Sequence, residues 1–393
     1  MTRVLLRAHK SPFAVASAAK TLTRNLIGNN VGNLVFSQAT YRLLSTAGTR
    51  IDARRLTGLD PGWVNERYDR VVVPLADAFR RSFVDELREL TRLIDRLTIP
   101  VTVLGVGCQG PLSGRIAPSA LDSEVTAFME AVLARSATVG VRGEITAAYL
   151  RRLGFGADVV DVIGCPSMFL GGPALGLKET GELTPGSRIS LNVSPYVPRM
   201  AAVALDHAAR YPGLTYTAQD HLTLGLMLRG HYDATTPGPA GAPTTLDHPL
   251  LRDRRTVFPL DPATWLRHLA GQEFSFGSRI HGNIVALLAG TPAVVLAHDA
   301  RTLELADYHE IPRLELREGT PVDAMALRAG ADFGPTVAGH PKRWARLLAF
   351  LDRQGVPHVY RPGESPAAFD SRLAAVRYPP LVRVGDRIPP WSA

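Results

Sequence analysis

The sequence predicts an α/β protein made of two Rossmann-like, doubly wound domains. Its 393 residues exceed the usual size of one domain, so the chain can bury two cores. In each half, short apolar runs alternate with longer stretches of helical periodicity, which is typical of open, mostly parallel sheets with helices on both faces. A Gly-Gly-Pro turn at residues 171–173 separates the two blocks. We therefore expect two domains that face each other across a cleft.

The first block, residues 1–172, is expected to form the N-terminal domain. Its apolar runs have the length of buried parallel strands; they are Val4–Ala8, Val71–Ala76, Val101–Gly107, Thr138–Val141 and Val159–Ile163. Helical patterns alternate with these runs; they cover Asn30–Leu44, Arg80–Leu97, Ser123–Ala134 and Glu144–Leu153.

The second block, residues 173–335, is expected to form the C-terminal domain. Strands are predicted at Arg188–Val193 and Thr256–Leu260. A helix follows at Asp261–Leu269, with Asp261 as its N-cap and Pro262 at its first position. Residues 273–297 then read as a strand, a turn, a helix closed by Gly290-Thr-Pro, and a last buried strand.

The remaining residues, 336–393, are expected to contribute a C-terminal helix and a Pro-containing tail. The helix is predicted at Arg343–Leu351, after Pro341, and the tail from Tyr378 is expected to wrap the surface. Asp233–Thr245 is rich in Pro, Gly and Thr, which predicts an exposed, mobile loop over the site.

Composition narrows the class of ligand and the compartment. The net charge is +8, but the arginines are scattered and no nucleic-acid-binding motif is present, so we expect anionic small molecules rather than nucleic acid. No window approaches the roughly 20 apolar residues that span a bilayer. Two isolated cysteines, Cys108 and Cys165, fit a reducing cytoplasm. An organelle transit peptide is the alternative, because basic but no acidic residues precede Asp52.

The predicted strand-to-helix turn that carries Arg279 and His281 gives the strongest chemical signal. Backbone N–H groups and the positive end of a helix dipole point at a ligand at such a turn. Arg279 adds a planar fork of donors, and His281 can hold or release a proton. An arginine without a counter-charge is costly there unless an anion binds. The turn predicts an enzyme that acts on a phosphorylated or carboxylated small molecule.

Other candidate site residues follow the predicted strands, because ligands bind at the carboxyl ends of parallel strands. These candidates are Asn33, Asp77, Gly107, Arg142, Asn192, Ser278, Asp299 and Arg301. Three of them have structural alternatives. Gly107 could serve only a tight turn at a strand end, Arg142 could pair with a carboxylate at a helix start, and Arg301 with Glu304 one helical turn away on the surface.

Several short blocks, in this order, resemble the polysaccharide pyruvyl transferase family. The blocks are Gly32-Asn33, Leu104–Gln109, Val141–Glu144, Gly164–Ser167, Ser190–Asn192, and Gly277–Gly282 with Gly290–Pro292. The similarity runs from about residue 28 to 300. The chain departs from the family at Asn33 and Gly143, where the family often has aspartate.

The resemblance implies a GT-B-like fold and a ketal-forming transferase of exopolysaccharide or cell-wall glycan synthesis. Pyruvate would pass from phosphoenolpyruvate to a sugar of a glycan or glycolipid acceptor, without a metal or another cofactor. The implied donor-binding residues are Arg142, Arg279, Ser278, Gly282 and Gly107, with His281 binding phosphate or transferring a proton. The implied acceptor or cleft residues are Asn33, Asp77, Asn192, Asp299 and Arg301.

Two other functions fit the same residues. A GT-B-like glycosyltransferase could hold the diphosphate of a nucleotide sugar at the same helix N-terminus. A catalytically divergent protein could bind a sugar or anion without turnover, and the departures at Asn33 and Gly143 favour this reading.

Overall fold

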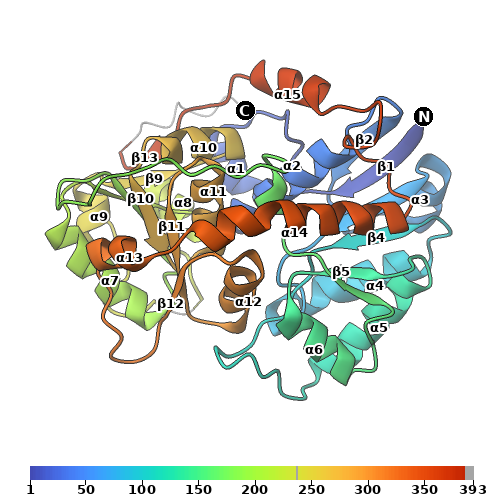
Figure 1. Cartoon of the computed structure of the whole chain (residues 1–393), viewed down its shortest axis with the longest axis horizontal. Coiled ribbons are helices and arrows are strands. Elements are labelled where there is room, and N and C mark those ends of the chain that lie inside the picture. Colours follow the sequence, from blue (N-terminus) through green and yellow to red (C-terminus); the bar gives the residue numbers. More distant parts are fainter. Residues whose placement is uncertain (236–237, 386–393) are drawn as a thin grey trace.

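Two mostly parallel sheets form the two halves of the molecule (Figure 1). The computed structural model describes residues 1–235 and 238–385. The first sheet has the order β2-β1-β3-β4, and all its strands are parallel. Its strands are β1 (Thr2–Arg7), β2 (Thr49–Arg54), β3 (Arg70–Pro74) and β4 (Val101–Leu104). The parallel pair β5 (Val139–Val141) and β6 (Val160–Val162) adjoins it through a bridge between Val106 and Val141.

Helices cover both faces of the first sheet, as the strand–helix alternation predicts. The helical segments of this half are α1 (Ala18–Thr23), α2 (Gly32–Leu44), α3 (Pro61–Arg67), η1 (Arg81–Phe83), α4 (Val84–Asp95), α5 (Leu121–Leu133), α6 (Glu144–Arg152) and η2 (Pro166–Phe169). In β1, Leu5 packs in the core with α4 and α5, while Val4 and Leu6 face the opposite core. This alternation is the period of two expected for a strand buried on both faces.

The second sheet is larger, with the order β12-β11-β10-β7-β8-β9-β13. Its strands are β7 (Ile189–Asn192), β8 (Leu214–Thr217), β9 (Thr256–Phe258), β10 (Phe274–Gly277), β11 (Ala293–Ala297), β12 (Arg313–Glu315) and β13 (Val382–Arg383). Only β13 runs antiparallel, where the chain tail adds an edge strand to β9. The predicted α/β class with two Rossmann-like halves is therefore confirmed.

The second half carries its own set of helices. They are α7 (Pro198–Arg210), α8 (His221–Arg229), α9 (Pro249–Arg252), α10 (Pro262–Ala270), α11 (Ile280–Leu288), α12 (Ala300–His309) and α13 (Ala324–Gly330), followed by α14 (Gly334–Arg353) and α15 (Ala367–Ala374). The predicted N-cap of α10 is confirmed, since the Asp261 carboxylate accepts from Thr264 N at 2.8 Å and Pro262 begins the helix. In the described residues, no helix has the length and apolarity needed to cross a membrane.

Two helices tie the halves together. The first turns of α2 pack in the core of the second sheet, whereas Leu43 and Leu44 at its end pack on the first. Helix α14 leaves the second half and crosses to the first sheet (Figure 1). There Trp344, Leu347 and Phe350 join the core that contains Val4 and Leu6 of β1.

Helix α14 also differs from its predicted start. It begins at Gly334 and contains Pro341, although the sequence predicts a start after that proline. Proline lacks the N–H of one intrahelical bond. The turns before it are held instead by tertiary contacts: the Thr336 hydroxyl donates to Glu310 O at 2.5 Å, and His340 Nε2 is hydrogen-bonded to Gly172 O at 2.9 Å. Packing outweighs the local preference.

The structure describes two predicted surface segments only in part. Residues 236–237 of the Asp233–Thr245 segment and residues 386–393 of the tail lie outside the described residues. In the described part of Asp233–Thr245, Ala242 and Pro243 are buried, and none of it lines the cavity introduced below. Most of the described part is an exposed or half-buried loop, as expected, but it does not line the cavity over which it was expected to lie. The tail passes near Pro12, whose carbonyl accepts from the Tyr378 hydroxyl, before it pairs as β13.

Candidate active site

A cavity of about 570 Å³ lies between the two halves. Residues that follow β1 and β3, together with the start of α2, line it from the first half. Residues that follow β7, β8, β10 and β11 line it from the second half. The cavity therefore lies at the carboxyl ends of both parallel sheets, the position where this class of fold binds ligands.

The turn between β10 and α11 is fixed by buried amides. Gly277 has φ +145°, and a side chain there would place its Cβ 1.9 Å from Asn192 O, so glycine lets β10 end close against β7. The Asn192 side chain accepts from Arg279 N at 2.8 Å and donates to Asn283 Oδ1 at 2.9 Å. Asn192 lies outside the cavity lining and orients the turn from behind, rather than standing in the cleft as expected.

This turn presents Arg279 to the cavity with few protein partners. Its Nη2 is 3.7 Å from Asp220 Oδ2, its Nε donates to Val193 O at 3.3 Å, and its guanidinium lies over the Tyr196 ring at 5.4 Å. Ser278 also lines the cavity, while its hydroxyl oxygen accepts from Ser194 N at 2.8 Å. The long, single ion contact leaves much of the Arg279 fork available to an anion.

Arg142, which follows β5, is the most buried charge of the cavity. Only 1% of its surface is exposed, and its Nε and Nη2 donate to Gly105 O at 3.2 Å. Among the described residues no carboxylate pairs with it, so the alternative of an ion pair at a helix start is wrong. Gly107 makes room for it, because a Cβ there would lie 2.3 Å from Arg142 Cδ. A buried guanidinium without a counter-charge is costly, and a bound anion would remove that cost.

His281 lines the same cavity but is packed on two sides. A Cβ on Gly32 would lie 2.7 Å from His281 Cγ, and His281 Nε2 is 3.8 Å from Cys165 Sγ. Burial, and then the positive charge of Arg142, lower the pKa of His281 to about 3. In the free protein its imidazole is therefore neutral near pH 7, able to donate one N–H and to accept one proton.

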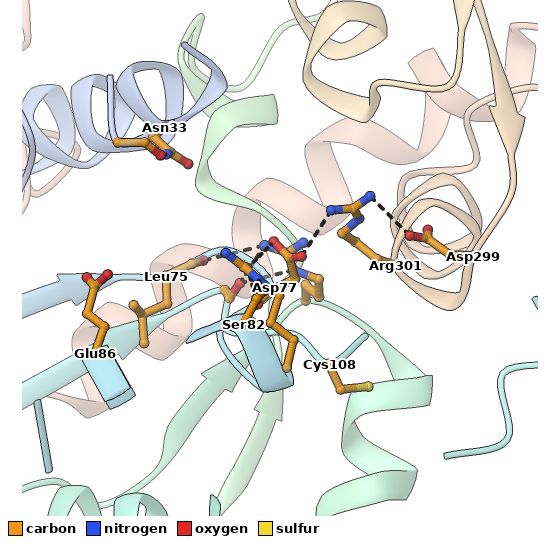
Figure 2. A network of polar contacts seen from close by, with 12 residues as sticks. Asn33, Leu75, Asp77, Ser82, Glu86, Cys108, Asp299 and Arg301 are labelled. Carbon is orange, nitrogen blue, oxygen red and sulfur yellow. Dashed lines mark hydrogen bonds and ion pairs between the residues drawn. The ribbon is translucent and has the colours of Figure 1, made fainter. Parts of the chain in front are cut away.

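A network of charges joins the halves across the cavity (Figure 2). Figure 2 shows Arg301, at the start of α12, reaching between Asp77 and Asp299, while Asn33 projects from α2 apart from the network. Arg301 lies 3.0 Å from each carboxylate, and Asp77 is also 3.0 Å from Arg80. Burial alone would raise the pKa of Asp77, but the charges of Arg301, Arg80 and Arg142 hold it well below its usual value. Asp77 remains ionised and serves as the ion-pair partner of Arg301 and Arg80, but not of Arg142.

A family model for polysaccharide pyruvyl transferase matches residues 30–300 of the chain. The chain belongs to the polysaccharide pyruvyl transferase family. No curated protein matches the sequence.

Several solved structures are similar at low identity. A functionally uncharacterised protein of Klebsiella pneumoniae has a TM-score of 0.44 at 11% identity, over 80% of this chain and 94% of that one. The UDP-GlcNAc 2-epimerase of Methanocaldococcus jannaschii, bound to UDP-GlcNAc and UDP, has a TM-score of 0.46 at 11% identity over 90% and 99%. The Streptomyces nogalater glycosyltransferase SnogD has a TM-score of 0.34 at 12% identity over 96% and 99%. Similarities of this size say nothing about function.

Both departures from the pyruvyl transferase pattern have a structural reason. The Asn33 amide nitrogen donates to Ile27 O at 3.0 Å and to Gly28 O at 2.7 Å, which an aspartate could not do. At Gly143, a Cβ would lie 2.2 Å from Glu304 Cγ. Each departure therefore fits its surroundings in this family member.

Glu304 corrects another expectation. It makes no surface pair with Arg301; it is 2% exposed and reaches across to α6 of the other half. There its carboxylate accepts from Thr146 N at 2.6 Å and from Thr146 Oγ1 at 2.9 Å. The carboxylate thus caps the N-terminus of α6 and links the halves.

The pH dependence of stability should reveal this buried carboxyl group. Burial raises the pKa of Glu304 from 4.5 to about 7 despite the Thr146 bonds. Between these values the folded protein holds a proton that the unfolded chain lacks, so stability falls as pH rises. The wild type should lose stability from this group between pH 5 and pH 8, whereas Glu304→Gln should not. The difference in unfolding free energy, variant minus wild type, should therefore rise by about 2 kcal/mol over this range. Denaturant titrations at both pH values would measure this gain. The exposed Glu144→Gln is the matched control, and an equal gain there would contradict the assignment.

Three further residues that were predicted to bind the donor or the acceptor lie outside the cavity lining. Gly107 makes room for Arg142, Asp299 orients Arg301, and a Cβ on Gly282 would lie 2.5 Å from Gln219 Nε2. The other predicted candidates line the cavity itself; they are Asn33, Asp77, Arg142, Ser278, Arg279, His281 and Arg301. Their catalytic or binding roles remain predictions.

The structure adds lining residues that the sequence did not single out. They are chiefly Arg7, His9, Arg55, Arg80, Gln219 and Asp220. Arg55 follows β2, and Gln219 and Asp220 follow β8, two strands that were not predicted. Arg7 ends β1, so the rule that ligands bind at strand ends would have found it. Among the described residues, no three His, Cys, Asp or Glu side chains gather as metal ligands do.

Proposed function

We propose that this protein transfers pyruvate from phosphoenolpyruvate to a sugar of a polysaccharide or glycan precursor and forms a pyruvate ketal. The family supports the transferase class. The main observation in favour of phosphoenolpyruvate as the donor is Arg142. Its guanidinium is buried on the cavity wall and has no carboxylate partner in the described chain. Arg279 and the amino end of α11 supply a second anion-binding group on the same wall.

The donor has two anionic groups and the cavity offers two arginines for them. One arginine binds the carboxylate and the other the phosphate, and the His281 N–H adds a neutral hydrogen bond. The remaining arginines of the cavity are less available. Arg301 and Arg80 are held by Asp77, and Arg7 is paired with Glu86 at 2.5 Å. Arg55 is exposed, and its Nη2 donates to the carbonyl oxygens of Arg24 and Asn25.

The reaction needs a proton on the methylene carbon before C2 can accept an oxygen. Protonation makes C2 electrophilic, one sugar hydroxyl adds to it, phosphate leaves, and a second hydroxyl of the same sugar closes the ketal. We assign the first proton to His281. Burial, and then the charge of Arg142, lower the pKa of His281 in the free protein. The negative charge of bound phosphoenolpyruvate would oppose both effects and favour proton uptake by His281.

The hydroxyl protons need an acceptor on the cavity wall. Asp77 suits this role poorly because two arginines hold it ionised. Glu86 and Asp220 are the other carboxylates of the lining. The released phosphate is a further proton acceptor in the same space, so these groups share the role of base.

Thermal-shift titration with phosphoenolpyruvate tests the donor. A ligand that binds only the folded state raises the melting temperature. We expect phosphoenolpyruvate to stabilise the wild type, and Arg279→Ala to weaken binding by about tenfold or more, since it removes charge-assisted hydrogen bonds. Arg92→Ala, an exposed arginine on α4 outside the cavity lining, is the control.

Nucleotide sugars form the second arm of the same titration. If a nucleotide sugar stabilised the protein and phosphoenolpyruvate did not, the protein would be a glycosyltransferase and this proposal would be wrong. Binding of phosphoenolpyruvate without phosphate release, across a panel of acceptor sugars, would instead identify a binding protein without turnover.

A further inference from the structure

Gln219 is a buried residue of the cavity lining, and the proposed donor-binding groups give its side-chain amide no role. It follows β8, lines the cavity and is 2% exposed. Neither its Nε2 nor its Oε1 has a hydrogen-bond partner among the described residues. Its backbone is fixed, because Gln219 O accepts from Val31 N at 2.9 Å. A buried polar group without a partner is destabilising. A small rotation of this side chain toward the cavity would let a bound ligand supply the missing partners.

The chemistry of the amide selects the kind of group that can bind. One amide atom donates and the other only accepts, so a complete partner must both accept and donate. Ionised phosphoenolpyruvate carries no donor and cannot satisfy Oε1. A hydroxyl carries both functions. Because both amide atoms lack partners, this conclusion holds for either orientation of the amide.

The neighbouring chain also offers acceptor oxygens. The Asn33 amide nitrogen is committed to two backbone carbonyls, which leaves its Oδ1 as the free end on the cavity wall. Asn30 and Asp220 form a bridge that holds this segment beside Gln219, and His221 N donates to Asn29 O at 3.0 Å. The free Oδ1 of Asn33 suits a hydroxyl donor of a sugar.

The position of Gln219 suits an acceptor close to the donor. Its Nε2 lies over Gly282. Gly282 directly follows His281 and is one helical turn from Arg279. A hydroxyl bound by Gln219 would therefore stand next to the groups assigned to phosphoenolpyruvate. Transfer requires this proximity of the two substrates.

We propose that Gln219 binds a hydroxyl group of the acceptor sugar and is a specificity-determining residue for that sugar. This inference rests on the proposed function, because the sugar is named as acceptor only if the protein is a pyruvyl transferase. The contact itself needs only the cavity and the unpartnered amide.

The test compares Gln219→Met with the wild type for both substrates. Methionine keeps the length of the side chain and removes both hydrogen-bonding atoms, so the ligand-free variant should be at least as stable as the wild type. If Gln219→Met is poorly folded, Gln219→Ala takes its place. Gln272→Met is the matched control, since Gln272 is also buried with an unpartnered Oε1 but lies outside the cavity lining.

Calorimetric titrations would use phosphoenolpyruvate alone, and then methyl glycosides of hexoses, N-acetylhexosamines and hexuronic acids at saturating phosphoenolpyruvate. We expect Gln219→Met to bind phosphoenolpyruvate within about threefold of the wild type and to lose about five- to tenfold in affinity for the best glycoside. Gln272→Met should match the wild type in both.

Four results would overturn the inference. They are an equal loss of phosphoenolpyruvate and glycoside binding, unchanged glycoside binding, no glycoside binding by the wild type, and uridine binding that depends on Gln219. The last result would mean that the Gln219 amide binds the uracil base of a nucleotide rather than a sugar hydroxyl. If the wild type bound glycosides through Gln219 but never bound phosphoenolpyruvate, the sugar contact would stand while the proposed pyruvyl transfer failed. The two failures are therefore distinguishable.

Discussion

Arg142→Met will lower the affinity for phosphoenolpyruvate by about a hundredfold and leave the ligand-free protein almost as stable as the wild type. The loss of binding follows because the buried guanidinium has no counter-charge until an anion arrives. The small stability change follows because two effects oppose each other. Removing the unpaired charge is favourable, while losing the bonds to Gly105 O and Leu75 O is not. Calorimetric titration and chemical denaturation measure the two quantities separately.

Arg142→Lys is the informative companion variant. Lysine keeps the charge but lacks the planar fork that reaches Gly105 O and an anion together. We expect it to recover only part of the affinity. Undiminished phosphoenolpyruvate binding in Arg142→Met would show that the donor binds elsewhere in the cavity.

Asp77→Asn will have the largest effect on stability, a loss of about 3 kcal/mol at pH 7. Removing one partner of a buried ion pair leaves the other charge uncompensated, and Asp77 is the counter-charge of both Arg301 and Arg80. Because the charges of these arginines lower the pKa of Asp77 below its usual 3.8, its contribution is complete above that value and disappears as pH falls below it. The gap between wild type and Asp77→Asn should therefore narrow in acid.

Denaturant unfolding at pH 7 and pH 3 would measure this gap. The control is Asp85→Asn, which removes an exposed pair with Arg88 and should change stability by less than about 1 kcal/mol. A similarly small change in Asp77→Asn would mean that the cross-cavity network does not hold the halves together. Phosphoenolpyruvate binding should survive the substitution, since a negative charge has been removed from the cavity.

Local signals were enough to predict much of the fold and one wall of the site. Apolar runs identified the central strands, and the Asp261-Pro262 pair identified the start of α10. The motif around Arg279 placed a strand, a turn and a helix where the structure has β10 and α11. These features depend on neighbours in the sequence, so one sequence can reveal them.

The other wall of the site depends on contacts that no local pattern contains. Strand β2 reads as polar because it lies at a sheet edge, and two threonines interrupt the apolar pattern of β8, so the residues after them were not recognised. Arg301 was expected beside Glu304, but it meets Asp77 while Glu304 meets Thr146 in the other half. Such pairings are set by tertiary packing, which can also carry α14 through a proline.

The crossing of α14 has a consequence for how the protein is made. Trp344 and Leu347 cover one face of the first sheet, yet a ribosome synthesises them long after Leu104 at the end of β4. At about 5–20 residues per second, that face stays without its cover for roughly ten to fifty seconds. The nascent first half must therefore remain soluble with apolar strands uncovered, which makes this interval the one in which chaperones would matter most.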